Sequence, residues 1–340
     1  MEALHALQNT QRISVLVIGD VMLDAYLIGQ VNRISPEAPV PIVDIHQRDK
    51  RLGGAANVAK NLIALGAQVQ VAATIGNDAA GQEIQRLFQT QGIGTAALVE
   101  VPGRPTTVKT RVISNGQQLL RVDEEQASEL EEPWTAELIT RCQNVIDNEC
   151  IDVVIFEDYD KGTLTPTVIA TVSALCREKG IKTTVDPKFR NFDRYRHVDL
   201  FKPNLKEMRE GLSMAIHKES DASLAQAVQR MHERLEASIS MVTLSERGLC
   251  FYAPDHSQDF QRIPAFEREI TDISGAGDAV IAVASVLLGL DVPVWQIAAV
   301  ANLAGGLVCE KVGVVTVERE RLQAEWETHA DAMAALMNSK

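Results

Sequence analysis

Apolar residues along the chain follow two alternating patterns, one typical of buried strands and one typical of helices. Short runs rich in β-branched residues recur at positions 15–18, 40–45, 69–75, 153–156, 182–185 and 239–244. Between many of these runs, apolar residues recur with the spacing of one helix face, at positions 55–65, 81–89, 166–179 and 224–235. Strands that alternate with helices require crossover connections. The pattern therefore predicts an α/β fold: a doubly wound, mostly parallel sheet with helices on both faces.

Two segments interrupt this alternation. Residues 24–50 contain strand-like pieces and three prolines but no helical pattern. Residues 106–123 are typical of a hairpin, because their two strands flank Asn115-Gly116, a strong two-residue turn signal. We expect one domain over residues 1–340, with these two insertions forming a small β-sheet lid.

Charge and composition restrict the class of function. The net charge is −13, from 33 lysines and arginines against 46 aspartates and glutamates. Such a chain repels phosphate backbones and anionic lipid, which argues against nucleic acid or a membrane surface as partner. Its five cysteines are scattered and form no Cys-x-x-Cys pair. Without a secretory signal pattern or an apolar stretch long enough for a bilayer, the chain is expected to be cytoplasmic.

The segment with the clearest chemical pattern is the glycine loop at 271–278, which directly precedes an apolar helix. Glycines at 275 and 277 let backbone N–H groups converge, and the helix start adds partial positive charge, so the turn suits an anion. Asp278 lies in the first helical turn, where it is suited to take a proton from an attacking hydroxyl during phosphoryl transfer. An ordinary glycine-rich turn whose aspartate merely suits a helix start is an equally open interpretation of this segment alone.

A second glycine segment, Gly53-Gly54-Ala55-Ala56-Asn57, opens another helix. The glycines permit close approach of backbone to a ligand, and the amide of Asn57 can both donate to and accept from a sugar hydroxyl. Asp20 and Asp24 follow the first strand and add carboxylates. A tight strand-to-helix turn explains the segment equally well, so the argument rests on the joint order of these pieces along the chain.

With these residues in place, the chain resembles the ribokinase-like family, the pfkB-type carbohydrate kinases. Gly53–Asn57 and Asp272–Asp278 are similar to the two family signatures, and Asn204-Leu205-Lys206-Glu207 is similar to its Asn-x-x-Glu element. Within the family, the chain is most similar to the heptose 7-phosphate kinases. That likeness is carried by the stretches 19–24, 33–41, 117–123, 186–188 and 202–207.

The resemblance implies a role for each matching residue. The expected catalytic residues are Asp278 as base and the backbone of Gly275, Ala276 and Gly277 as anion hole. Residues expected around ATP are Asn204, Leu205, Lys206, Glu207, Thr243, Glu246, Gly248 and Asn302. Asp24, Gly53, Gly54 and Asn57 are expected to hold the sugar. The resemblance also implies Mg²⁺, supported indirectly by Glu207, and a homodimer, and it leaves the need for a monovalent cation open.

The implied reaction is ATP-dependent phosphorylation of the anomeric hydroxyl of D-glycero-β-D-manno-heptose 7-phosphate to the 1,7-bisphosphate, a step towards ADP-heptose for lipopolysaccharide core. Another sugar or a nucleoside as substrate stays open, as does a non-catalytic sugar or nucleotide sensor on the same fold. The chain lacks a Walker-type Gly-x-x-x-x-Gly-Lys-Ser/Thr string and the His-x-Gly-His signature of an adenylyltransferase. We therefore expect the kinase activity alone.

The hairpin predicts how a sugar phosphate is recognised. Lys109, Arg111 and Arg121 concentrate positive charge in an acidic chain, with Arg33 in the other insertion. A strict two-residue turn pairs Arg111 with Leu120, which places Lys109 and Arg111 on one face and Arg121 on the other, so all three reach one phosphate only if a bulge intervenes. We expect Lys109 and Arg111 to bind the phosphate of the sugar, although a solvated charged face is the simpler alternative.

Overall fold

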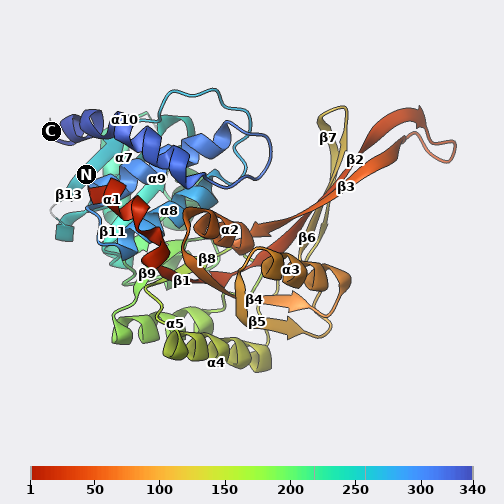
Figure 1. The fold of residues 1–340 in the computed structure, drawn as a ribbon, viewed down its shortest axis with the longest axis horizontal. Coiled ribbons are helices and arrows are strands. Elements are labelled where there is room, and N and C mark those ends of the chain that lie inside the picture. The colour runs from red at the N-terminus through yellow and green to blue at the C-terminus, as the bar shows by residue number, and fades with distance from the viewer. Residues whose placement is uncertain (1, 218, 257, 339–340) are drawn as a thin grey trace.

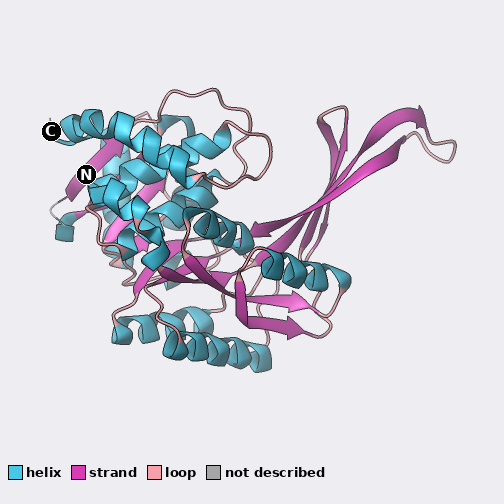
Figure 2. Cartoon of the chain, in the orientation of Figure 1, coloured by secondary structure: helices cyan, strands magenta, loops and turns pink. Residues whose placement is uncertain are grey.

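The computed structural model describes residues 2–217, 219–256 and 258–338 and contains a nine-stranded sheet at its centre (Figures 1 and 2). In spatial order its strands are β13 (Gln258–Ile263), β12 (Leu249–Ala253), β11 (Ile239–Thr243), β10 (Leu200–Phe201), β9 (Lys182–Asp186), β8 (Val153–Glu157), β1 (Ser14–Gly19), β4 (Gln68–Gly76) and β5 (Gly94–Val101). The strands from β5 to β11 are parallel, and β12 and β13 add an antiparallel edge. The predicted fold class is confirmed.

Helices cover both faces of this sheet. One layer comprises α1 (Glu2–Gln8), α2 (Ala55–Leu65), α3 (Ala79–Thr90), α8 (Ala276–Gly289), α9 (Val294–Cys309) and α10 (Arg319–Asn338). The other comprises α4 (Glu132–Asn148), α5 (Pro166–Lys179), α6 (Leu205–Leu212) and α7 (Asp221–Leu235). Short 3₁₀ turns are η1 (Thr10–Arg12), η2 (Phe192–Arg194), η3 (Ser245–Arg247) and η4 (Pro254–His256).

Strand β1 shows why the first apolar run is continuous rather than alternating. Val15 and Val17 belong to one core cluster and Leu16 and Ile18 to the other, and all four side chains are fully buried. Because successive side chains of a strand point to opposite faces, a strand covered by helices on both sides must be apolar at every position. Within the described residues, no helix combines the length and apolar content needed to cross a bilayer.

The two insertions form a second sheet that projects from the body (Figure 1). Its strands, in spatial order, are β3 (Pro41–Gly54), β2 (Val21–Ile34), β6 (Val108–Ser114) and β7 (Gln117–Glu124). We call it the small sheet. Leu23, Leu52 and Val108 at its base pack into the core, whereas every residue of β7 is exposed. Its function as a lid remains a prediction.

The register of the hairpin corrects the sequence prediction. The two strands flank Asn115-Gly116 as expected, but a bulge lies between Val112 and Ile113. Arg111 therefore pairs with Arg121 rather than with Leu120, and Lys109 pairs with Asp123. An extra residue on one strand of a pair shifts every later side chain to the other face. Arg121 consequently shares a face with Lys109 and Arg111, which the strict two-residue turn had excluded.

Candidate active site

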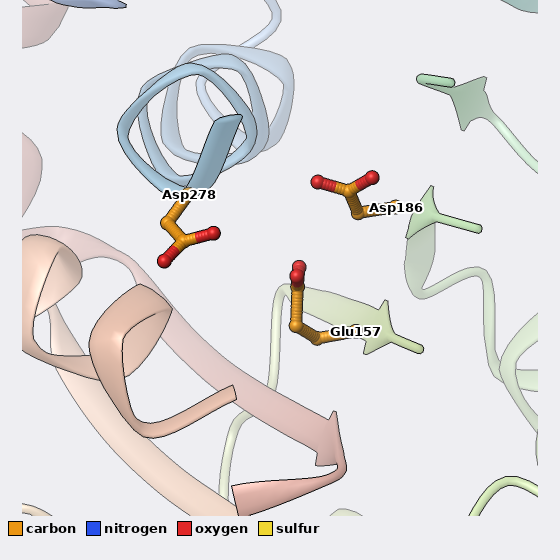
Figure 3. Close-up of side chains that lie close together, drawn as sticks. All are labelled: Glu157, Asp186 and Asp278. Carbon is orange, nitrogen blue, oxygen red and sulfur yellow. The ribbon is translucent and has the colours of Figure 1, made fainter. Parts of the chain in front are cut away.

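Three carboxylates converge at the carboxyl edge of the main sheet: Glu157, Asp186 and Asp278 (Figure 3). Glu157 ends β8, Asp186 ends the neighbouring β9, and Asp278 lies in the first turn of α8. Each contributes an oxygen that lies within 4.8 Å of the other two, and all three side chains are buried. The carboxyl edge of a parallel sheet is where ligands bind in open α/β folds.

Burial and mutual repulsion act on these carboxylates together. Burial, followed by the charges of Asp186 and Asp278, holds the pKa of Glu157 well above its ordinary value. Lys202 supplies partial compensation, because its ammonium lies 2.7 Å from a carboxylate oxygen of Asp186 and the side chain is only 2% exposed. Burial opposes the charge of Lys202, yet the charges of Asp186, Glu207 and Glu157 raise its pKa. The site is thus a cluster of buried carboxylates around a buried cation.

Two hydrogen bonds fix the carboxylate of Asp278. The amide Nδ2 of Asn57 donates to Oδ2 at 2.5 Å, and the hydroxyl of Tyr159 donates to Oδ1 at 3.0 Å. Burial raises the pKa of Asp278, while these two donors favour its ionised form and oppose the increase. A buried carboxylate with a raised pKa, whose ionised form still has two hydrogen-bond donors, is suited to act as a general base.

The predicted anion-binding loop lies directly beside this cluster. Gly275 caps α8 with φ of 81°, a conformation that favours glycine, and a Cβ there would approach the amide of Asn57 to 3.1 Å. A Cβ at Gly277 would lie 3.7 Å from both Asp186 Oδ2 and Lys202 Nζ. The N–H of Ala276 is engaged in a turn with the carbonyl of Ile273 at 3.3 Å. The loop is therefore next to the carboxylates, and its function as an anion hole remains a prediction.

The predicted Asn-x-x-Glu element forms a complete helix cap. Asn204 accepts from the N–H of Glu207 at 2.9 Å, and Glu207 accepts from the N–H of Asn204 at 2.8 Å. The other oxygen of Glu207 accepts from Lys188. Leu205 packs against the core, whereas the side chain of Lys206 is 82% exposed. This geometry explains Glu207 by capping and charge pairing, so its support of Mg²⁺ remains a prediction.

The other residues predicted around ATP lie in one neighbourhood. The N–H of Thr243 donates to Pro203 O at 3.1 Å, one residue before Asn204. Gly248 has φ of 83°, and a Cβ there would lie 2.1 Å from the carbonyl oxygen of Ile263. Glycine has no Cβ and so avoids this clash. Asn302 donates to the next carbonyl, that of Pro264, at 2.8 Å. Glu246 lies between Thr243 and Gly248, in η3.

The predicted sugar-binding residues divide into two groups. Asp24 lies against Gly53, where a Cβ would approach its Oδ2 to 2.3 Å, and pairs with Arg111 at 2.6 Å. Gly54 caps α2, three residues before Asn57. The ammonium of Lys109, however, is held by Asp123 and Glu125, each at 3.1 Å. The structure therefore brings Arg111, but not the ammonium of Lys109, to Asp24.

Sequence reasoning missed several residues of the site. Glu157 and Tyr159 had no motif, although Glu157 directly follows a buried strand run. Asp186 and Lys202 entered only as parts of stretches that carried the family likeness. Asp20, noted only as a carboxylate after the first strand, accepts the N–H groups of residues 159, 161 and 163, each at 3.0 Å. It thereby anchors the loop that delivers Tyr159 to Asp278.

The donor set fits a divalent cation. The buried atom Glu157 Oε2 has no hydrogen-bond partner among the described residues. Unpartnered buried carboxylate oxygens are costly, and a hard cation with oxygen ligands would satisfy them. Glu157 and Asp186 could therefore hold such an ion beside Asp278.

A buried aspartate at a helix start, a glycine loop before it and two further buried carboxylates lie at the carboxyl edge of a doubly wound sheet, as expected for a sugar kinase of the ribokinase-like fold. The sequence profile of the pfkB family of carbohydrate kinases matches residues 12–321, and the chain belongs to this family. Membership implies ATP and a divalent metal ion.

Relatives support this assignment over nearly the whole chain. It is 39% identical over 332 residues to the bifunctional protein HldE of Trichlorobacter lovleyi, covering 97% of this chain and 66% of that protein. It is 37% identical to HldE of Geobacter metallireducens, covering 99% of this chain and 68% of the relative. The chain thus spans about two thirds of the length of these relatives.

Solved structures show the same fold at low identity. The Escherichia coli phosphofructokinase-2 complex with fructose-6-phosphate aligns with a TM-score of 0.74 at 18% identity, covering 93% of this chain and 99% of the other. Ribokinase of Thermotoga maritima aligns with a TM-score of 0.67 at 16% identity, with the same coverage of both chains.

The first prediction concerns Lys202. Lys202→Met should lower the free energy of unfolding by about 3–5 kcal/mol near neutral pH, because it leaves buried carboxylates without their cation. The folded-state pKa values of Glu157 and Asp278 are raised, so stability from them is present in acid and lost as pH rises through those values. The deficit should therefore be larger at pH about 8 than at pH about 5.

Urea unfolding of wild type and variant at both pH values measures this. Lys206→Met, at a highly exposed lysine, is the matched control and should change stability by less than about 0.5 kcal/mol. An equal deficit at both pH values would contradict the electrostatic explanation.

Proposed function

We propose that the protein transfers the γ-phosphoryl group of ATP to the anomeric hydroxyl of D-glycero-β-D-manno-heptose 7-phosphate. The product is the 1,7-bisphosphate, a precursor of ADP-heptose for lipopolysaccharide core. The observation that carries the proposal is the buried Asp278 carboxylate at the start of α8, held by Asn57 and Tyr159. The choice of heptose rests on the sequence likeness and on relatives named HldE.

In this proposal Asp278 accepts the proton of the anomeric hydroxyl while the oxygen of that hydroxyl forms a bond to the γ-phosphorus of ATP. The bond to the leaving ADP breaks at the same phosphorus, and ADP carries away the electron pair. The glycine loop from Gly275 to Gly277 and the positive end of α8 stabilise the charge on the transferred group. Asn57 orients the base, and Asp24, Gly53 and Gly54 hold sugar hydroxyls.

ATP would occupy the side of the site formed by two groups of residues: Asn204 to Glu207, and Thr243, Glu246, Gly248 and Asn302. A bound Mg²⁺ would neutralise charge on the ATP phosphates. Glu157 and Asp186 would hold it together with the substrate phosphates, and Glu207 would support it indirectly. We further propose that the protein is a cytoplasmic enzyme of one domain and that the small sheet acts as a lid over the sugar.

A coupled assay of ADP release over a panel of sugars, sugar phosphates and nucleosides tests the substrate. Fastest turnover of heptose 7-phosphate is the expected result. Faster turnover of free ribose, fructose or a nucleoside would replace the heptose in the proposal. If none of these compounds gave ADP release, the result would favour the alternative of a non-catalytic sensor.

The second prediction is that Asp278→Asn lowers kcat about a hundred- to ten-thousand-fold, because an amide cannot accept the proton. ATP affinity should change little, since the base contacts the hydroxyl rather than the nucleotide. Steady-state kinetics and calorimetric titration with ATP measure the two quantities. Asp147→Asn, at an exposed aspartate of α4, is the matched control. A variant that keeps its rate within a few-fold of wild type would exclude Asp278 as the base.

The third prediction concerns Tyr159, whose hydroxyl favours the ionised form of Asp278. Tyr159→Phe removes this donor, so the pKa of Asp278 should rise further. Because the base must be ionised, the acid-side limb of kcat/KM should move to higher pH, with little change of rate on the plateau. Tyr252→Phe, at a tyrosine whose ring packs edge-to-face with that of His232, should leave the limb in place. A limb that stays fixed in Tyr159→Phe would show that the hydrogen bond does not tune the base.

The fourth prediction is a homodimer through the small sheet. Apolar side chains lie exposed on it at Ile34, Val40, Ile45, Leu119, Leu120 and Val122. Its outer strands β3 and β7 also present backbone groups that a second copy could cover. Light scattering at micromolar concentration should give twice the chain mass, and Leu120→Lys should shift the mass towards the monomer. A wild-type monomer under these conditions would refute the proposal.

A further inference from the structure

Positive side chains gather around one aromatic ring at the base of the small sheet. The guanidinium carbons of Arg51 and Arg111 lie 4.9 and 5.4 Å from the ring centroid of Tyr26. Arg51 is the register partner of Asp24 across β2 and β3, and Arg111 is the partner of Tyr26 across β2 and β6. Residues paired across neighbouring strands share a face, so both arginines lie on the face that carries Asp24.

Lys60 adds a third cation from the main body. It lies on α2 three residues after Asn57, so its side chain is a neighbour of Asn57 on the helix surface, about 5–6 Å away. The side chain is half-buried, and within the described parts of the chain no ion pair or hydrogen bond engages its ammonium. Burial lowers the pKa of Lys60 most, and the charge of Arg51 lowers it further. The charges of Asp24, Asp278 and Asp49 act in the opposite direction.

Two of the three cations have ion-pair partners within the small sheet. Arg51 pairs with Asp49 at 2.7 Å and Arg111 with Asp24 at 2.6 Å. Lys60 has no such partner among the described residues and is partly removed from water beside Arg51, although the charges of Asp24, Asp278 and Asp49 also act on it. Holding such a group costs free energy unless an anion joins it. In a chain of net charge −13, three cations gathered beside the proposed catalytic aspartate indicate an anionic ligand.

The placement of the three cations relative to Asp278 indicates where the two ends of the ligand lie. Helix α2 carries both Asn57, which contacts Asp278, and Lys60, one turn farther along. A substrate whose reacting hydroxyl lies at Asp278 would have its opposite end at the three cations. We propose that Arg51, Lys60 and Arg111 form the binding site for a phosphate group at the end of the sugar remote from the reacting hydroxyl.

This inference rests on the proposed function, because it takes Asp278 as the reacting end, and it replaces Lys109 by Lys60 and Arg51. Guanidinium groups match the geometry of phosphate oxygens with paired N–H donors, and an ammonium adds a compact charge. Lys109 is less suited than the two arginines, because two carboxylates hold its ammonium whereas Arg51 and Arg111 each pair with one. A neutral hydroxyl at this position would add no negative charge beside Lys60.

The test compares phosphorylated and unphosphorylated sugars in charge-removing variants. Lys60→Met keeps the aliphatic stem and removes the ammonium, and Arg51→Gln removes the guanidinium. Each should raise KM for heptose 7-phosphate about ten- to a hundred-fold, with KM for free heptose changed less than about threefold. Lys60→Arg should restore most of the preference for the phosphorylated sugar. Lys179→Met, at a lysine on α5 paired with Asp147, is the matched control and should change neither KM.

Equal losses on both sugars would overturn the proposal, since they would mean that the cations only position Asp24 and Tyr26. Loss of the preference in Lys109→Met with Lys60→Met unaffected would overturn it in favour of the hairpin. If wild type does not phosphorylate heptose 7-phosphate, the proposed substrate fails separately. Calorimetric binding of fructose 6-phosphate against fructose then tests the phosphate site without turnover, and a wild type that binds both equally would refute it.

Discussion

The structure depends on an electrostatic constraint: three carboxylates must stay close together in a buried space. About 120 residues of sequence separate Glu157 from Asp278, and Asp186 lies between them. Only the tertiary fold therefore brings the three carboxylates together. Repulsion at this separation is strong where water is excluded. The surrounding residues can be understood as responses to that repulsion, beginning with the buried ammonium of Lys202 against Asp186.

The carboxylates differ in their hydrogen-bond partners, and these differences support the different roles proposed for Asp278 and Glu157. Asp278 has two side-chain donors, Asn57 and Tyr159, which keep it available as an ionised acceptor. Glu157 has an oxygen without a partner and a strongly raised pKa, so it gains most from a cation that arrives with the nucleotide. In the proposed mechanism, one fold thus holds a proton acceptor and a metal-binding group close together, because hydrogen bonds make the two carboxylates differ in protonation.

Sequence patterns could reveal those parts of the fold that depend on local physics. The run at 15–18 is apolar at every position because both faces of β1 are covered, and the glycines before Asp278 mark the start of α8 because φ at Gly275 is positive. The capping box of Asn204 and Glu207 was also visible in the Asn-x-x-Glu spacing. Strand β10 has only two residues and shows no period, so nothing local could predict it.

Non-local features were missed for a different reason. The bulge between Val112 and Ile113 leaves no mark in the residue pattern, and a register without it assigns Arg121 to the wrong face. Glu157 and Lys202 were ordinary residues at strand ends until the sheet order placed them beside Asp278. The basic residues that matter most were likewise hidden, because Arg51 and Lys60 belong to different elements and no charge run contains both.

Helix α2 links the two ends of the proposed substrate site. It begins at Gly54, immediately after β3 of the small sheet, and packs against α8, which carries Asp278. Movement of the small sheet would therefore act on Arg51 and Arg111, whereas Asn57, Lys60 and Asp278 stay on packed helices. A phosphate bound by all three cations would connect the moving part to the fixed part through charge-assisted contacts. Recognition of the remote phosphate and closure of the small sheet over the sugar would then be one event, and the free energy of binding that phosphate would favour the arrangement in which the reacting hydroxyl faces its base.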